Sequence, residues 1–417
     1  MPAVISLLVE HLDALWPVDG PAPRAGVRQG AHQAIADGAI ACDGETIAAV
    51  GTTADVRSRA SISDRTQIID GRGRSLVPGF VDGHTHVVFA GDRREELRQR
   101  LSGATYAEIA AAGGGILSTV RATRAASAAD LLTQTRKRLD EMLAAGTTTC
   151  EAKSGYGLET PTEVRMLEVI AEINRTHPMD VSATFMGAHE VPPEYRGRQA
   201  EYVRLVIDQM IPAAAPHAEW CDVFCDRGFF TPEESTAILA AGRAAGLKPR
   251  LHADELAASG GPAVAAGVGA RSADHLVQVT PDGIAELRRA GTVATLLPMA
   301  AFYLKLGRFA PARDLITAGV PVALATDVNP GGGFSPSMAF AMTLACFGMG
   351  MTFEEALAAA TINGAYSLDR HDRAGSLEPG KQFDAVMVDG PAVNLLRVNA
   401  HPITHVFKKG ILVHVRQ

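Results

Sequence analysis

From about residue 78 to residue 368, short apolar runs alternate with longer amphipathic segments. In residues 128–145, leucines and a methionine recur at helical spacing among charges, Gly146 ends the pattern, and residues 147–152 resume as an extended run. The short runs predict buried strands and the amphipathic segments predict helices. The expected strands are 77–81, 147–152, 181–185, 220–224, 248–251, 272–276, 292–297 and 320–325, and the expected helices are 128–145, 161–176, 199–211, 232–245, 260–266, 281–290, 311–318 and 353–368.

Eight strands, each followed by a helix or a long loop, predict an α/β fold of the TIM (β/α)8 barrel type, whose chemistry lies where the strands end. Both ends of the chain are instead rich in strand and turn signals. Residues 39–42 and 46–50 flank the turn dipeptide Asp43-Gly44, and short extended pieces follow Gly375. We therefore expect a barrel at 78–374 and a small composite β-sandwich domain formed by 1–77 and 375–417.

The composition of the chain indicates which kinds of molecule it binds. The chain has 417 residues, 47% of them apolar, and a net charge of −7, which argues against a nucleic-acid surface and favours small-molecule partners. Its five cysteines are scattered without metal or redox spacing, which favours a reducing compartment. No stretch approaches 18 uninterrupted apolar residues, so we expect a soluble, cytoplasmic protein without a membrane partner.

Four candidate metal ligands end predicted barrel strands. His84 and His86 are two residues apart, so their side chains point to the same side of a strand. His252 and Asp327 end two other strands, and strand ends meet at one mouth of a barrel. Taken alone, His252 is compatible with a hydrogen-bonded core histidine and Asp327 with a loop cap. Together the four predict a metal site with an open position for water.

Two further residues are placed to handle protons. Glu255 follows His252 by three residues, and a carboxylate beside a metal-bound water is suited to transfer protons between water and a leaving nitrogen. His275 ends the next strand, where it could hydrogen-bond the hydroxide, serve as a further ligand, or orient other groups.

These motifs resemble the amidohydrolase superfamily: Pro-Gly-Phe-Val-Asp-Gly-His-Thr-His at 78–86, His-Ala-Asp-Glu at 252–255, Ser-Ala-Asp-His-Leu at 272–276 and Ala-Thr-Asp at 325–327. The resemblance covers nearly the whole chain and implies a metal-bearing TIM barrel with a β-sandwich made by both termini. Longer blocks resemble the imidazolonepropionase family within it, at 91–93, 112–116, 118–124, 153–158 and 187–190.

The resemblance implies hydrolysis of the ring C–N bond of 4-imidazolone-5-propanoate to N-formimidoyl-L-glutamate, in histidine degradation. It implies one divalent metal per chain, zinc or iron, a substrate with a carboxylate tail and, by family habit, a homodimer. The substrate-binding positions that match are Arg93, Tyr106, Tyr156, His189, Glu255, Asn329, Gly331 and Gly332.

Alternative interpretations remain at this point. Arg93 could lie on a solvated helix start, Tyr156 could pack between glycines, and Lys153 is interpreted as structural because the resemblance is to a mononuclear member. Another amidohydrolase, such as a heterocycle or nucleobase deaminase, would use a similar metal site, but a neutral base gives no reason for Arg93 and Tyr156. A barrel that has lost catalysis is disfavoured by the retained ligands and Glu255.

Overall fold

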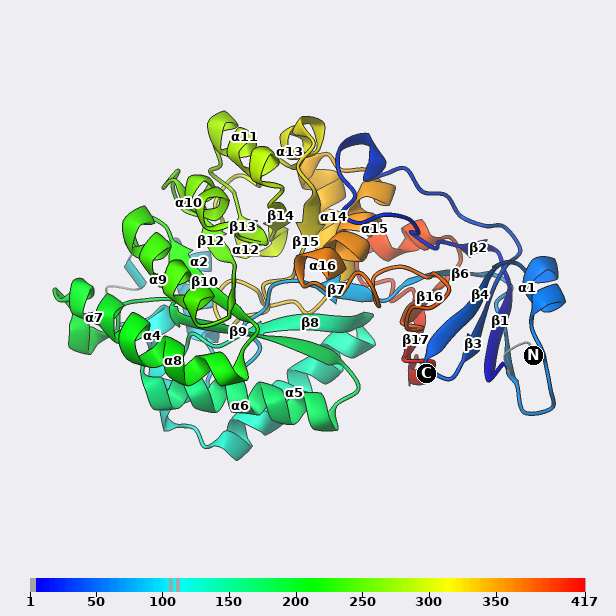
Figure 1. Ribbon diagram of the computed structural model, residues 1–417, viewed down its shortest axis with the longest axis horizontal. Coiled ribbons are helices and arrows are strands. Elements are labelled where there is room, and N and C mark those ends of the chain that lie inside the picture. The colour runs from blue at the N-terminus through cyan, green and yellow to red at the C-terminus, as the bar shows by residue number, and fades with distance from the viewer. Residues whose placement is uncertain (1–4, 105–107, 110–112, 417) are drawn as a thin grey trace.

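The structure is a computed structural model of the 417-residue chain and describes residues 5–104, 108–109 and 113–416. Figure 1 shows a barrel surrounded by helices at the left and centre, and the sheets made by the chain ends at the right. No helix in the described part of the chain is both long and apolar enough to cross a membrane.

The barrel is a parallel sheet whose neighbouring strands follow chain order, as the sequence predicts. Its two ends are joined by backbone hydrogen bonds from Asp327 N to His84 O (3.0 Å) and from His86 N to Val328 O (2.8 Å). The strands are β7 (Phe80–Asp82), β8 (Thr147–Lys153), β9 (Asp180–Ala188), β10 (Trp220–Cys225), β11 (Lys248–Pro249), β12 (Leu251–Ala253), β13 (Ser272–His275), β14 (Val293–Leu296) and β15 (Val322–Leu324).

Helices connect the strands and bury their apolar faces against the sheet. In α5, the Ser127 side chain caps the first turn by accepting from Asp130 N, and Leu131, Leu139 and Met142 are buried. The helices that follow β7 are α2 (Arg94–Leu101), α4 (Ile116–Ala125), α5 (Ala128–Ala144), α6 (Thr160–Thr176), α7 (Gln199–Leu205), α8 (Ile211–Ala214), α9 (Pro232–Ala244), α10 (Gly261–Val268), α11 (Pro281–Ala290), α12 (Pro298–Tyr303), α13 (Ala312–Ala318), α14 (Met338–Met349), α15 (Phe353–Ala360) and α16 (Ile362–Ser367).

Most predicted elements are confirmed, but four expected segments are divided. The expected strand 248–251 is split between β11 and β12 at Arg250. The run 77–81 breaks at Gly79, because β6 (Arg74–Pro78) pairs with β16 while β7 joins the barrel; a Cβ at Gly79 would lie 2.4 Å from Thr148 Oγ1. The expected helix 353–368 breaks at Thr361, whose φ and ψ are −127° and −93°. The expected helix 199–211 contains a π-helical turn, Val206–Met210.

The chain ends form two sheets that pack on each other. One sheet has the order β4-β3-β1-β5 and the other β18-β17-β16-β6-β2, so strands from both ends share the second sheet. Their common core includes Leu7, Ile40, Phe383 and Phe407. The strands are β1 (Leu7–Leu12), β2 (Ala14–Leu15), β3 (Gly38–Asp43), β4 (Thr46–Thr52), β5 (Gln67–Asp70), β16 (Ala385–Asp389), β17 (Ile403–Lys408) and β18 (Ile411–Val415), and α1 (Thr53–Arg59) follows β4.

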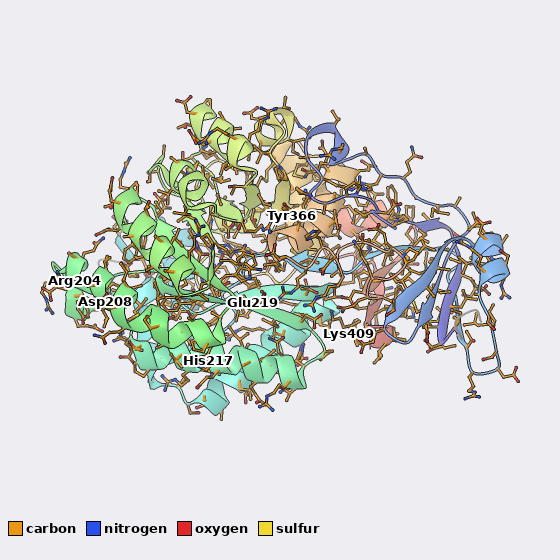
Figure 2. All side chains as sticks on the ribbon, in the orientation of Figure 1. Arg204, Asp208, His217, Glu219, Tyr366 and Lys409 are labelled. Atoms are coloured by element: carbon orange, nitrogen blue, oxygen red, sulfur yellow. The ribbon has the colours of Figure 1, made fainter. Side chains whose placement is uncertain are left out.

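An ion cluster joins this second sheet to the end of the barrel at which the strands begin. Asp180, the first residue of β9, accepts from Lys408 Nζ at 2.8 Å and from Lys409 Nζ at 2.9 Å. Lys408 Nζ also donates to Asp384 Oδ2 at 2.7 Å. Figure 2 shows Lys409 at the boundary between the barrel and the terminal sheets. Charges from distant parts of the chain therefore neutralise one another across this boundary.

Candidate active site

The strand ends bring the four predicted metal ligands together at the carboxyl end of the barrel. Asp327 Oδ1 lies 3.6 Å from His84 Nε2 and 3.7 Å from His86 Nε2. His252 Nε2 lies 3.4 Å from His86 Nε2. The four side chains are buried. His84 and His86 follow β7 and Asp327 follows β15, the two strands that meet where the barrel closes, whereas His252 lies in β12 on the opposite side of the barrel from β7. Residues far apart in sequence thus converge as the pattern of strand ends predicts.

The donor atoms of this cluster suit a divalent cation. Candidate ligand atoms of His84, His86 and Asp327 lie within 4.8 Å of one another, and so do those of His84, His252 and His275. Among the described residues, His84 Nε2 and His275 Nδ1 are buried without a hydrogen-bond partner. Buried polar atoms are usually paired, so lone pairs left over in one cluster are what a cation would occupy. Imidazole and carboxylate ligands accept zinc and iron alike.

Burial favours the neutral forms of the predicted ligands. Burial, followed by Lys153 and the neighbouring histidines, lowers the pKa of His84 well below its usual value, which keeps the imidazole neutral with a lone pair to offer. Burial raises the pKa of the Asp327 carboxyl to about 8. A cation beside this carboxyl would restore its ionised form at neutral pH.

Two carboxylates that the sequence analysis did not identify orient the ligand histidines. His84 Nδ1 donates to Asp274 Oδ2 at 2.6 Å, and His252 Nδ1 donates to Asp222 Oδ1 at 2.9 Å. Because carboxylate oxygens accept, the hydrogen of each ring lies on Nδ1 and the lone pair lies on Nε2, toward the cluster. Both carboxylates are fully buried within barrel strands.

Two buried cations neutralise these carboxylates. Lys153 Nζ donates to Glu151 Oε1 and to Asp222 Oδ2, each at 2.7 Å, and Arg250 Nη2 lies 3.4 Å from Asp274 Oδ2. Burial opposes the charge on Lys153, but Asp222 and Glu151 outweigh burial and raise its pKa. Lys153 therefore remains a protonated partner of carboxylates, which agrees with its interpretation as a structural residue.

Three of the same strand ends carry a strained backbone conformation. Asp254, His275 and Asp327 have φ of 50°, 74° and 54°, in the left-handed region that non-glycine residues rarely adopt. Such strain persists where the surrounding structure enforces it, commonly at functional sites. Here it turns each chain segment abruptly as it leaves the barrel.

Glu255 lies on the loop that follows one of these turns. Its Oε1 is 3.6 Å from His275 Nδ1, and both side chains line the cavity beside the metal-ligand cluster. The loop is anchored by Asp226, which accepts from Leu256 N at 2.7 Å and from Ala257 N at 3.1 Å. Burial, with the charges of Asp327 and Asp226 nearby, raises the pKa of Glu255 well above its usual value. The side chain is thus held in place for proton transfer.

One cavity of about 90 Å³ brings the other predicted residues to this cluster. Its wall is partly apolar, with Ile116, Phe224 and Leu304 among the lining residues. Tyr106 lies outside the described residues, so its predicted role is not tested. The polar residues of the lining are His86, Arg93, Tyr156, His189, His252, Glu255, His275, Asp327 and Asn329, together with Gly331 and Gly332.

Tyr156 and His189 lie on the side of the cavity next to His86. The rings of His189 and His86 stack with centroids 4.8 Å apart, and His189 Nδ1 donates to Gly155 O at 2.9 Å. Glu163, which sequence reasoning missed, holds the loop before Tyr156 by accepting from the backbone N–H groups of Gly155 (2.9 Å), Gly157 (2.7 Å) and Leu158 (2.8 Å). A glutamate seven residues beyond a glycine-flanked tyrosine is the sequence signal that could have suggested it.

Asn329 shapes the glycine loop that follows Asp327. Its Oδ1 accepts from Gly331 N at 2.7 Å and from Gly332 N at 2.6 Å, and its Nδ2 donates to Asp327 O at 2.7 Å. These backbone N–H groups therefore point to Asn329. The assignment of Asn329, Gly331 and Gly332 as substrate contacts stays a prediction.

Comparisons with known proteins converge on one group of enzymes. A family model described as "Amidohydrolase family" matches residues 231–415, and one described as "Imidazolonepropionase-like composite domain, bacteria" matches residues 38–60. An imidazolonepropionase of Alkaliphilus metalliredigens is 43% identical over 415 residues and covers 98% of each chain. An imidazolonepropionase of Geobacillus kaustophilus is 49% identical over 360 residues, covering 86% of this chain and 85% of its own.

Solved structures of other enzymes share the architecture. The guanine deaminase of E. coli superposes with a TM-score of 0.72 at 17% identity, covering 98% of this chain and 99% of its own. At such low identity the likeness shows the fold alone.

Proposed function

The chain belongs to the imidazolonepropionase family of amidohydrolases, and on this premise we propose that it hydrolyses 4-imidazolone-5-propanoate to N-formimidoyl-L-glutamate. The observation that carries the proposal is a single cavity lined both by residues of the buried His/Asp cluster and by Arg93 and Tyr156. A charged guanidinium inside a partly apolar cavity suits a substrate that combines a heterocycle with a carboxylate. By this reaction the enzyme acts in histidine degradation.

We propose that His84, His86, His252 and Asp327 hold one zinc or iron ion per chain. When bound, such an ion supplies an electrophilic centre that makes a water molecule nucleophilic at neutral pH. His275 would offer the ion a fifth ligand or, through Nδ1, would provide a hydrogen-bonding group beside Glu255.

The remaining steps use groups of the chain. Glu255 accepts a proton from the attacking water as the new C–O bond forms at the ring carbonyl. It then returns that proton to the ring nitrogen as the C–N bond breaks, so the amide is converted into an amidine nitrogen and a carboxylic acid, which ionises by releasing the second proton of the water to solvent. His189 contacts the ring through Nε2, because its Nδ1–H is engaged by the Gly155 carbonyl.

Binding of the propanoate is assigned to Arg93 and Tyr156, with Tyr106 as a further contact. Arg93 offers a planar fork to a carboxylate, and the Tyr156 phenol can donate beside it. Asn329, Gly331 and Gly332 are proposed to complete the wall for ring and product.

The larger organisation follows the same premise. We propose a cytoplasmic enzyme with a composite β-sandwich domain (1–77 and 375–417) and a barrel domain (78–374). A homodimer is proposed as well, and light scattering of the purified protein would test it.

The direct test mixes freshly generated 4-imidazolone-5-propanoate with the metal-analysed protein and follows the loss of ring absorbance, with a chelator-treated sample alongside. Fast turnover that chelation abolishes is the expected result. Absence of turnover with about one metal bound per chain would contradict the proposed substrate and favour a heterocycle deaminase, which release of ammonia from nucleobases would reveal.

A further inference from the structure

The inward face of α2 is charged, although inward helix faces are normally apolar. Arg93 immediately precedes the helix, and Glu96 and Arg100 lie within it, three and seven residues after Arg93. All three side chains are buried. Their helix neighbours Glu95 and Arg98 have exposed side chains, at 71% and 82%. Burying charges is costly unless each is held by partners, so this face has a role beyond packing.

Glu96 fixes the orientation of Arg93. Its Oε2 accepts from Arg93 Nε at 2.7 Å, and its Oε1 accepts from Gly115 N at 2.9 Å. Gly115 immediately precedes α4, whose first residue, Ile116, lines the cavity. One carboxylate therefore ties the guanidinium to the cavity wall and sets the plane of its fork.

Gly331 provides the surface against which the guanidinium rests. A Cβ at this position would lie 2.1 Å from Arg93 Nη1 and 2.3 Å from Cζ, so no larger residue fits beside Arg93 in this position. The backbone of Gly331 is itself held, because its carbonyl accepts from Arg100 Nη2 and its N–H donates to Asn329 Oδ1 at 2.7 Å. Arg93 is thus fixed between a carboxylate and a glycine.

We propose that Glu96 and Gly331 are positioning residues that determine specificity for a carboxylate-bearing heterocycle by fixing the Arg93 guanidinium. Identifying that carboxylate with the propanoate of the substrate rests on the proposed function. Neither residue needs to touch the substrate, and Gly331 contributes through the space it leaves rather than through a hydrogen bond.

A double-mutant cycle on turnover tests this assignment. Glu96→Gln is expected to raise KM about tenfold with kcat within about twofold, since uniform binding of the tail is lost. In an Arg93→Ala background, Glu96→Gln should raise KM no further, because its effect passes through Arg93. The control Glu95→Gln, on the exposed face of the same helix, should leave both constants unchanged. An unchanged KM for Glu96→Gln, or fully additive effects in the double variant, would overturn the proposal.

A binding measurement separates this inference from the proposed reaction. Calorimetry would compare 3-(imidazol-4-yl)propanoate with 4-propylimidazole, which shares the ring and chain length but lacks the carboxylate. Glu96→Gln should weaken the acid about tenfold and leave the neutral compound unaffected. If wild-type protein fails to turn over the imidazolone but shows this pattern, the reaction is wrong and the positioning role stands. Equal weakening of both compounds, or of neither, would overturn the role.

Discussion

The two ends of the barrel both bury charged side chains, but they differ in how much bonding capacity is left unused. At the amino-terminal ends of the strands, Asp180 and Asp384 are matched by Lys408 and Lys409 at hydrogen-bond distance. At the carboxyl-terminal ends, an imidazole nitrogen such as His84 Nε2 remains without a partner among the described residues. Charged groups are thus paired at one end, whereas a ligand nitrogen is left unpaired at the other.

Backbone strain, by contrast, does not separate the two ends. Asp254, His275 and Asp327 adopt positive φ at the carboxyl-terminal strand ends, and Lys409 of the ion cluster at the other end has a φ of 51°. Matched charges stabilise a fold, whereas unpaired ligand atoms are retained where they serve chemistry. This difference in pairing separates the residues that stabilise the fold from those that would act on a ligand. Substitutions at the amino-terminal end should lower stability, and substitutions at the carboxyl-terminal end should lower metal affinity or turnover.

The largest effect is expected for Glu255→Gln, which keeps the size of the side chain but removes its proton-transfer ability. We expect kcat to fall about 10³-fold, within the usual contribution of general acid–base catalysis. Metal content and thermal stability should match the wild type, because Glu255 is not among the predicted ligands. Steady-state kinetics with metal analysis would check this, and Glu233→Gln on the exposed first turn of α9 is the control. Near-normal turnover would show that another group moves the proton.

The comparison of the two barrel ends is tested most directly by substituting one buried carboxylate at each end. Asp274→Asn removes the acceptor that orients His84, and we expect metal affinity to fall about 10–100-fold. Asp384→Asn changes an equally buried carboxylate at the other end, and it should lower thermal stability while leaving metal affinity unchanged. Competition with a chromogenic chelator would measure the affinities. If Asp384→Asn weakens metal binding as much as Asp274→Asn does, the division between the two ends is wrong.

Much of the fold was predictable because each barrel strand is a short apolar run with an amphipathic helix after it. Helix α14 was missed for the opposite reason: its twelve residues, Met338–Met349, include no charged side chain, so no polar face marks a helical period. The division at Gly79 was also not predictable, because only the structure shows that Thr148 excludes a side chain there.

At the site, the predicted ligands were visible because histidine and aspartate stand out at the ends of apolar strands. Asp222 and Asp274 were not visible, since a single carboxylate inside a strand has no local pattern that distinguishes it from a solvated one. Glu163 and Glu96 likewise act on backbone or side chains that only the fold brings near them. Sequence pattern therefore found groups that line the cavity, and missed the groups that hold them in place.

The smallest effect is expected for Asp180→Asn at the amino-terminal end. Burial alone would raise the pKa of Asp180, but Lys408 and Lys409 lower it to about 2, below the value near 4 of an unfolded aspartate. Because the folded pKa is the lower one, the ion pairs stabilise the fold above about pH 4, and this stabilisation is lost as pH falls through about 2. The shift corresponds to about 2 kcal/mol at neutral pH, or a fall of a few degrees in Tm for the variant.

Thermal unfolding of Asp180→Asn and wild type across pH would measure this difference. The Tm gap should be constant from pH 8 to pH 5 and should narrow to about half at pH 3, where part of the wild-type advantage has been titrated away. Turnover and metal content should be unaffected, since the cluster lies at the opposite end of β9 from the cavity. A gap that stays constant down to pH 3 would mean that the Asp180 side chain stabilises the junction by packing rather than by charge. A loss of metal affinity would instead show that the two ends are coupled through the strand that connects them.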